Sequence, residues 1–225
     1  MIVEPAHAIL DAMDLYFFDC DDTLYDYDFR KRLPALARLT GTSEYHLAST
    51  WWAGGHERAA ESGEYTTSEE YLRAFRLVTG AKLTLAQWQE ARASAMTLVP
   101  GSLDALRWAA DHGTTSLLSN NPMPFHDCLP ELAAEAHALL QGNDLISAIL
   151  GARKPERRIY TRALGVFGAQ ARDAILIDDS AANVQGAIDA GMHAYQLRHT
   201  DGGADRAAGY DTAGLQAALE AFASR

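Results

Sequence analysis

The chain has 225 residues, of which 48% are hydrophobic and 22% are charged. These fractions are typical of a globular protein and exclude a disordered, collagen-like or fibrous chain. Lysine and arginine contribute 19 residues against 30 acidic ones, and the formal net charge of −11 disfavours nucleic acids and anionic membranes as partners. A small phosphorylated ligand is compatible with this charge, because a metal ion or a local cluster of cations can reverse its sign.

Cysteine usage and the first residues of the chain indicate the cellular compartment. The two cysteines, Cys20 and Cys128, are too few for a disulfide scaffold in a chain of this length. No apolar run approaches the roughly 20 residues that span a bilayer. The N-terminal residues lack a basic region and are interrupted by Glu4, Pro5 and Asp11, so we expect no signal peptide. The sequence therefore predicts a cytoplasmic protein.

Short apolar runs bounded by glycine, aspartate or asparagine predict buried strands. These runs are Leu15–Phe18, Ser116–Leu118, Ile146–Leu150, Ala174–Ile177 and Ala194–Leu197. Helical patterns alternate with the later runs, at Ser102–His112, Leu129–Leu140, Glu156–Phe167 and Ala181–Ala190. Because strands that alternate with helices form a parallel sheet covered on both faces, we expect a doubly wound α/β fold.

The stretch of residues 25–96 breaks this alternation, since it contains only helical patterns. Two capping boxes mark helix starts within it, Thr67 with Glu70 and Thr84 with Gln87. A connection of about 70 residues is far longer than neighbouring strands usually need, which indicates an inserted helical domain. We therefore expect a helical domain of residues 25–96 within a core of residues 1–24 and 97–225.

Three carboxylates follow the first predicted strand, at Asp19, Asp21 and Asp22. Negative charges this close repel one another unless a cation lies among them. Oxygen ligands suit Mg²⁺, which uses one or two carboxylates and keeps positions for water and for a phosphate. The cluster is compatible with a Mg²⁺ site, and an acidic loop that caps the next segment is the alternative.

Polar groups also follow three of the other predicted strands. Ser119-Asn120-Asn121-Pro122 offers a hydroxyl and amides, Lys154 places a cation before Pro155, and Asp178-Asp179 is a second acidic pair. Each group alone is compatible with turn, surface or helix-capping chemistry. All of them fall at the carboxyl ends of strands, where open α/β sheets bind ligands, and this joint pattern predicts one site.

Four motifs, in this order and around a helical insert, make the sequence resemble the haloacid dehalogenase-like (HAD) hydrolase superfamily over nearly its whole length. The motifs are Asp19-Cys20-Asp21-Asp22-Thr23, Ser119, Lys154-Pro155 and Asp178-Asp179. The resemblance implies a Rossmann-like core with an inserted α-helical cap of the C1 type. Asp22 departs from the glycine that many members carry there. Within the superfamily, the chain is most similar to the α-D-glucose-1-phosphate phosphatase-like subgroup, through Gly63-Glu64-Tyr65-Thr66, Arg153-Lys154-Pro155 and Asp178-Asp179-Ser180-Ala181-Ala182-Asn183-Val184.

The resemblance implies a phosphatase that works through an aspartyl-phosphate. Asp19 would attack phosphorus, and Asp21 would protonate the leaving alcohol and then deprotonate the attacking water. Ser119 and Lys154 would act with them by stabilising charge on the transferring phosphate. The residues that bind the phosphate would be Thr23, Ser119, Asn120 and Lys154.

The resemblance also implies Mg²⁺ as the cofactor. Its ligands would be the carboxylates of Asp19 and Asp179 and the backbone carbonyl of Asp21, with Asp178 bound directly or through a water. The ion would remove the repulsion between an anionic nucleophile and an anionic phosphate. The expected substrate is a small phosphorylated metabolite, with sugar phosphates ahead of nucleotides. We expect a monomer or a homodimer.

Three other functions share parts of this pattern. A 2-haloacid dehalogenase would use Asp19 on carbon without a metal, and it needs neither Asp21 nor the Asp178-Asp179 pair. A phosphomutase would share every core residue and would differ in the cap residues that hold a bisphosphate. A non-catalytic ligand-binding protein would have lost at least one catalytic position, and none is lost.

Overall fold

The computed structural model describes residues 14–200 and 206–225 of the chain. Residues 1–13, which the sequence assigns to the core, lie outside the described residues. Within the described ranges, none of the helices is long and apolar enough to span a membrane.

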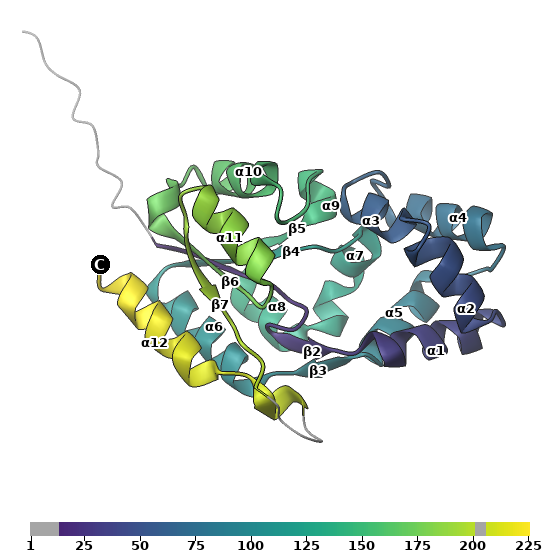
Figure 1. The fold of residues 1–225 in the computed structure, drawn as a ribbon, viewed down its shortest axis with the longest axis horizontal. Helices are drawn as coiled ribbons and strands as arrows, with labels where there is room; N and C mark the ends of the chain where they lie inside the picture. The colour runs from purple at the N-terminus through teal and green to yellow at the C-terminus, as the bar shows by residue number, and fades with distance from the viewer. Residues whose placement is uncertain (1–13, 201–205) are drawn as a thin grey trace, which may run out of the picture.

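A parallel sheet forms the centre of the fold, with the strand order β5-β4-β1-β6-β7 (Figure 1). Its central strand β1 pairs with β4 on one side and with β6 on the other, so that Phe18 lies beside Leu117 and Ile177. Every residue of β1 is buried, as expected for a strand whose sheet is covered on both faces. The predicted α/β fold is confirmed. The strands are β1 Leu15–Phe18, β4 Thr114–Ser119, β5 Asp144–Ile146, β6 Ala174–Asp178 and β7 His193–Gln196.

Alternate residues of β1 point to opposite faces of the sheet, and each face packs against its own layer of helices. Tyr16 and Phe18 belong to a hydrophobic cluster with buried residues of α6, α8 and α12. Leu15 and Phe17 belong to a second cluster, with residues of α10 and α11. Figure 1 shows the two layers on either side of the sheet. The helices are α6 Pro100–His112, α8 Ala134–Leu140, α10 Arg157–Phe167, α11 Ala181–Asp189 and α12 Thr212–Ala223.

A group of helices, here called the helical insert, lies between the antiparallel strands β2 (Tyr25–Tyr27) and β3 (Met96–Leu98). The insert packs on α7 (Met123–Leu132) through α4 and α5, and Figure 1 shows it at one end of the molecule. Its interior is aromatic, with Trp51 buried against Tyr71. The insert consists of α1 Phe29–Thr40, α2 Glu44–Leu47, a π-helical turn Ala48–Trp52, α3 His56–Glu61, α4 Ser68–Thr79 and α5 Leu85–Ala93.

The two predicted helix starts in the insert are confirmed. Thr84 Oγ1 accepts a hydrogen bond from Gln87 N, and the side chain of Gln87 accepts one from Thr84 N, which completes a capping box. Thr67 caps α4 by accepting from Glu70 N, but the Glu70 carboxylate accepts from Thr66 N. The box predicted at Thr67 is therefore only half formed.

The predicted strand Ile146–Leu150 is wrong beyond its first residue. β5 ends at Ile146, and Ser147–Leu150 is a short helix, α9. Ser147 Oγ accepts a hydrogen bond from Asn121 N at 3.0 Å, and this contact fixes the chain where it leaves the sheet. A short apolar run does not distinguish a buried strand from a buried helical turn, which explains the error.

The predicted helix Leu129–Leu140 is also wrong, because two helices occupy this stretch. α7 begins earlier, at Met123, with Pro124 in its first turn, and ends at Leu132. Ala133, with φ −139° and ψ 47°, separates it from α8. The strands β2 and β3 were not predicted, since three residues are too few to show an alternating pattern. Short 3₁₀ turns complete the described elements, at Ala171–Asp173 and Arg206–Gly209.

Candidate active site

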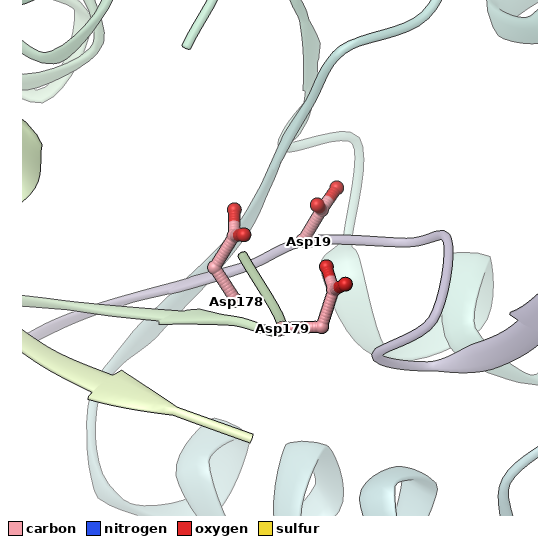
Figure 2. Close-up of side chains that lie close together, drawn as sticks. All are labelled: Asp19, Asp178 and Asp179. Atoms are coloured by element: carbon pink, nitrogen blue, oxygen red, sulfur yellow. The ribbon is translucent and has the colours of Figure 1, made fainter. Parts of the chain in front are cut away.

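The carboxyl ends of β1 and β6 bring three carboxylates together, and Figure 2 shows them around one point. Asp19 directly follows β1, Asp178 ends β6, and Asp179 comes next. Because Phe18 pairs with Ile177 in the register, the following residues are neighbours, and Asp19 N donates to Ile177 O at 2.9 Å. One oxygen of each carboxylate lies within 4.8 Å of the others. Residues from two of the predicted motifs thus form one acidic cluster.

The turn after β1 is anchored by Asp22, the residue that departs from the glycine common in the superfamily. Asp22 has a φ of 53°, in a region that glycine enters freely and that aspartate tolerates better than most residues. Its carboxylate accepts hydrogen bonds from Tyr27 N at 3.1 Å and from the Tyr210 hydroxyl at 3.2 Å. These contacts tie the turn to β2 and to the C-terminal part of the chain.

Lys154 brings a positive charge into the acidic cluster. Its Nζ lies 3.0 Å from Asp19 Oδ2 and 2.5 Å from Asp178 Oδ2, and the residue is 1% exposed. Burial alone would lower the pKa of Lys154, but the carboxylates of Asp178 and Asp19 hold it above its ordinary value. The lysine is therefore buried and charged, and it bridges the ends of both strands.

The carboxylates outnumber this ammonium, and burial, with the excess of negative charge, raises their pKa values. Burial raises the pKa of Asp19 to about 6, against the lowering effects of Lys154 and of the Ser119 hydroxyl. Burial, followed by the charges of Asp19 and Asp178, raises the pKa of Asp179 to about 7. A divalent cation would relieve this repulsion, and an all-oxygen donor set suits Mg²⁺. The residues present fit a Mg²⁺ ion.

Asp178 differs from its neighbour Asp179 because protein donors contact both of its carboxylate oxygens. Oδ1 accepts from Ser180 N at 2.9 Å and from Asn183 Nδ2 at 3.0 Å, while Oδ2 accepts from Lys154 Nζ. Within residues 14–200 and 206–225, no donor reaches the carboxylate of Asp179. Asp179 also borders a hollow of about 420 Å³, so its carboxylate is the more accessible of the pair.

Ser119, at the end of β4, orients the carboxylate of Asp19. The Ser119 hydroxyl donates to Asp19 Oδ1 at 2.6 Å and accepts from Asn121 Nδ2 at 2.9 Å. All three residues are buried. The pairing of β4 with β1 brings the serine and the aspartate together, although they lie 100 residues apart in the sequence.

Asn120 and Thr23 are both predicted to bind phosphate, and their side chains have different surroundings in the structure. Asn120 Nδ2 donates to Lys154 O at 3.0 Å, and Lys154 N donates to Asn120 Oδ1 at 2.8 Å. The Asn120 side chain thus holds the backbone of the lysine loop. Thr23 is fully buried, and its hydroxyl has no hydrogen-bond partner within the described part of the chain.

Asp21, the predicted acid and base, lies outside the acidic cluster. Its carboxylate forms an ion pair with Arg92 of α5, and its side chain is 26% exposed. It lines a cavity of about 340 Å³ between the core and the helical insert, which Asn120 and Asn121 also line. The cavity therefore adjoins the predicted acid, the residue that supports Ser119 and the residue that holds the Lys154 loop.

The insert contributes charged side chains to the opposite wall of this cavity, among them Arg58 and Glu61. Glu61 Oε2 lies 2.7 Å from Arg153 Nη2. Arg153 belongs to the loop that also carries Lys154. Burial and the charge of Glu57 raise the pKa of Glu61 to about 7, against the lowering effect of Arg153. The cavity is thus polar and carries charges of both signs.

Sequence reasoning gave no role to Arg92, Glu61 or Arg153. An arginine near the end of a helix is usually a surface charge, and nothing local links Arg92 to Asp21, which lies 71 residues away. Of these three residues, only Arg153 could have been found from the sequence, because it immediately precedes Lys154 in the predicted motif.

Solved structures share this fold at low sequence identity. A HAD family enzyme from Bacteroides thetaiotaomicron is 19% identical, with a TM-score of 0.68 over 83% of this chain and 94% of that chain. A HAD-like family hydrolase from Porphyromonas gingivalis is 18% identical, with a TM-score of 0.65 over 82% and 91%. The L-2-haloacid dehalogenase from Xanthobacter autotrophicus is 19% identical, with a TM-score of 0.55 over 82% and 77%. At these identities the likeness shows the fold.

A protein-family model assigns the chain to a family, whereas the solved structures show only its fold. The model for haloacid dehalogenase-like hydrolases matches residues 13–191, which is well over half of the chain. The matched range contains all four motifs, from Asp19 to Asp179. The resemblance is confirmed at this level, and the chain is an enzyme that belongs to the haloacid dehalogenase-like hydrolase family.

Proposed function

We propose that this enzyme is a Mg²⁺-dependent phosphatase that hydrolyses a small phosphate monoester, with a sugar phosphate as the favoured substrate. The observation that carries the proposal is the cluster of Asp19, Asp178 and Asp179 around the buried ammonium of Lys154. It combines a carboxylate nucleophile, donors for a divalent cation and a positive charge for a phosphate. The HAD family enzyme from Bacteroides thetaiotaomicron was solved in complex with magnesium and inorganic phosphate, which supports the proposal.

In this proposal, Asp19, Asp179 and the backbone carbonyl of Asp21 would hold Mg²⁺. Asp178 would act through a water, because its carboxylate is fully buried whereas that of Asp179 borders the hollow. When bound, the ion would neutralise charge on the phosphate and on the nucleophile. Ser119 and Lys154 would bind the phosphate oxygens, together with the backbone N–H of Asn120 and with Thr23.

The first proposed step transfers the phosphoryl group to the protein. A carboxylate oxygen of Asp19 attacks phosphorus, and the bond between phosphorus and the alcohol oxygen breaks. Asp21, in its protonated form, gives its proton to the departing oxygen, so that a neutral alcohol leaves and Asp21 becomes an anion. Because Asp21 borders the cavity beneath the helical insert, the alcohol part of the substrate would occupy that cavity.

The second proposed step hydrolyses the aspartyl-phosphate. The Asp21 carboxylate takes a proton from a water, whose oxygen attacks phosphorus. The bond between phosphorus and the Asp19 oxygen then breaks, which releases inorganic phosphate and restores the Asp19 carboxylate. Asp21 is protonated again and ready for the next substrate.

The helical insert would serve as a cap of the C1 type, with residues 25–96 forming the cap and the rest of the chain the core. It covers the cavity next to Asp21, so it would select the alcohol part of the substrate. The similarity of Gly63-Glu64-Tyr65-Thr66, and of the segments around Lys154 and Asp178-Asp179, to the α-D-glucose-1-phosphate phosphatase-like subgroup supports a sugar phosphate as the substrate. We therefore rank sugar phosphates ahead of nucleotides.

A panel of substrates tests the proposal. Purified protein should release phosphate from p-nitrophenyl phosphate and from sugar phosphates with Mg²⁺, lose this activity with a chelator, and regain it when Mg²⁺ is restored. Halide release from a 2-haloacid that persists without metal would contradict the proposal and support a dehalogenase. Isomerisation of a sugar phosphate primed by its bisphosphate would instead support a phosphomutase. Binding of phosphate esters without turnover would support a non-catalytic protein.

A further inference from the structure

Arg92 is a buried cation at the junction of the helical insert and the core. It lies in the last turn of α5, shortly before β3 returns the chain to the core, and it is 1% exposed. Its guanidinium carbon lies 4.2 Å from the ring centroid of Tyr27 and 5.0 Å from that of Phe125. Because these rings belong to β2 and α7, the guanidinium is held by elements outside its own helix. A cation buried this deeply is costly unless it is paired.

The guanidinium reaches two groups of the active site at once. Arg92 Nη2 forms the ion pair with Asp21 Oδ1 and lies 3.4 Å from Asn121 Oδ1. Asp21 is partly exposed, so without a fixed partner its carboxylate could rotate into solvent. The rigid, aromatic-flanked arginine supplies such a partner.

The contact with Asn121 sets the direction of a hydrogen-bond chain. A guanidinium can only donate, so the amide of Asn121 turns its oxygen to Arg92 and its nitrogen to Ser119. Since Ser119 Oγ accepts from that nitrogen, its own proton is free to go to Asp19 Oδ1. The chain thus runs from the helical insert to the proposed nucleophile.

We propose that Arg92 is a positioning residue, which holds the Asp21 carboxylate in place and fixes the Asn121 amide that orients Ser119 and Asp19. The inference rests on the proposed function, because it assigns Arg92 a role in delivering the proton of Asp21. Through these two contacts, the last turn of α5 is linked both to the acid and base and to the nucleophile.

Kinetics with two leaving groups test the role of Arg92. An alkyl phosphate needs a proton on its departing oxygen, whereas p-nitrophenolate leaves without one. For Arg92→Gln, we expect kcat/KM to fall about 100-fold with the alkyl ester and about tenfold with p-nitrophenyl phosphate. Arg92→Lys, which keeps the charge but not the planar fork, should recover part of both losses. It also serves as the test variant if Arg92→Gln does not fold.

Two further variants separate the two contacts of Arg92. Asn121→Ala breaks the chain to Ser119 but keeps the pair with Asp21, so it should lower kcat/KM by about the same factor, roughly tenfold, for both esters. Arg38→Gln is the matched control. Arg38 of α1 is exposed and forms an ion pair at 2.8 Å with Glu90, which lies in α5 as Arg92 does. The kcat/KM of Arg38→Gln should stay within about twofold of the wild type for both esters.

The possible results lead to different conclusions. A wild-type enzyme that hydrolyses neither ester contradicts the proposed function. An active wild type whose Arg92→Gln variant loses the same factor with both esters leaves the proposed function intact and contradicts the role of Arg92 in holding Asp21, since the contact with Asn121 alone affects both esters equally. A gain with the alkyl ester would also overturn positioning, since it would show that Arg92 acts by keeping Asp21 ionised. A rise in KM with unchanged kcat would instead make Arg92 a substrate-binding residue.

Discussion

Lys154 places its ammonium 3.0 Å from the carboxylate of Asp19, inside the core and out of contact with water. The same nitrogen contacts Asp178, so one buried cation compensates two buried carboxylates at the carboxyl ends of different strands. Removal of one partner from such a group leaves charges that water cannot solvate, which costs more than the pairing itself contributes. The lysine should therefore support the fold as well as the chemistry.

Replacement of Lys154 by methionine tests this double role. The variant keeps an unbranched side chain but leaves Asp19 and Asp178 without their ammonium, so we expect the free energy of unfolding to fall by about 3–5 kcal/mol. Urea denaturation at neutral pH without added metal measures the loss. Lys82→Met, at an exposed position, is the control and should change stability by about 0.5 kcal/mol or less. Equal stabilities of the two variants would contradict the prediction.

Asp19→Asn should abolish turnover without unfolding the protein. An amide is not a nucleophile for phosphorus, while its oxygen can still accept the hydrogen bond from Ser119. Phosphate release and circular dichroism measure the two parts of the prediction. Asp22→Asn removes the same charge three residues away, and its amide oxygen can still accept from Tyr27 N, so it should remain active. Substantial turnover by Asp19→Asn would exclude Asp19 as the nucleophile.

Glu61, which is not part of the acidic cluster, makes the stability of the protein depend on pH. Burial and the neighbouring charges of Glu57 and Asp21, opposed by Arg153, raise its pKa from 4.5 to about 7. The folded state then binds this proton more tightly than the unfolded state, so Glu61 lowers stability as the pH rises from 4.5 to about 7. Above that range, its effect is constant.

Glu61→Gln removes this titration and should therefore become more stable relative to the wild type as the pH rises. The difference in unfolding free energy should shift in favour of the variant by at most about 3 kcal/mol. Urea denaturation of both proteins across the range measures the shift. Glu64→Gln, on the exposed surface nearby, controls for the loss of one charge. A difference that stays constant with pH would disprove the raised pKa of Glu61.

The sequence located the core of the site because its residues are tied to strand ends. Asp19 and Asp179 each follow a short buried run, and parallel pairing of β1 with β6 places such residues side by side. Ser119 is placed in the same way by β4. For these residues, a prediction of strands in a parallel sheet was enough to bring them together.

Other parts of the site depend on contacts that no local pattern carries. The pair of Arg92 and Asp21 requires the helical insert to pack on the core, and the position of Asn120 depends on its reciprocal bonds to the Lys154 backbone. The helix at Ser147–Leu150 replaces a predicted strand because β5 pairs with β4 only as far as Ile146. Each of these features is decided by tertiary packing, so the sequence pattern did not predict them.

Asp21→Asn should separate the two steps of the proposed reaction. A sugar alkoxide is a poor leaving group at neutral pH and needs a proton as its bond to phosphorus breaks, whereas p-nitrophenolate leaves without help. The second step needs Asp21 as a base whichever substrate formed the aspartyl-phosphate. With p-nitrophenyl phosphate, the variant should therefore release a burst of p-nitrophenol close to the enzyme concentration and then stall.

The same variant should show no burst with a sugar phosphate, because the first step itself then lacks its acid. Rapid-mixing absorbance measures the release of p-nitrophenol, and quenched-flow analysis measures the release of the sugar from the sugar phosphate. The stalled protein should carry an acid-stable, hydroxylamine-sensitive phosphate on Asp19, as an acyl phosphate does. Bursts of equal amplitude with both substrates would show that Asp21 is not the acid. The proton would then have to come from another group that lines the cavity, and Glu61, whose pKa is raised to about 7 by burial, would be the next residue to replace.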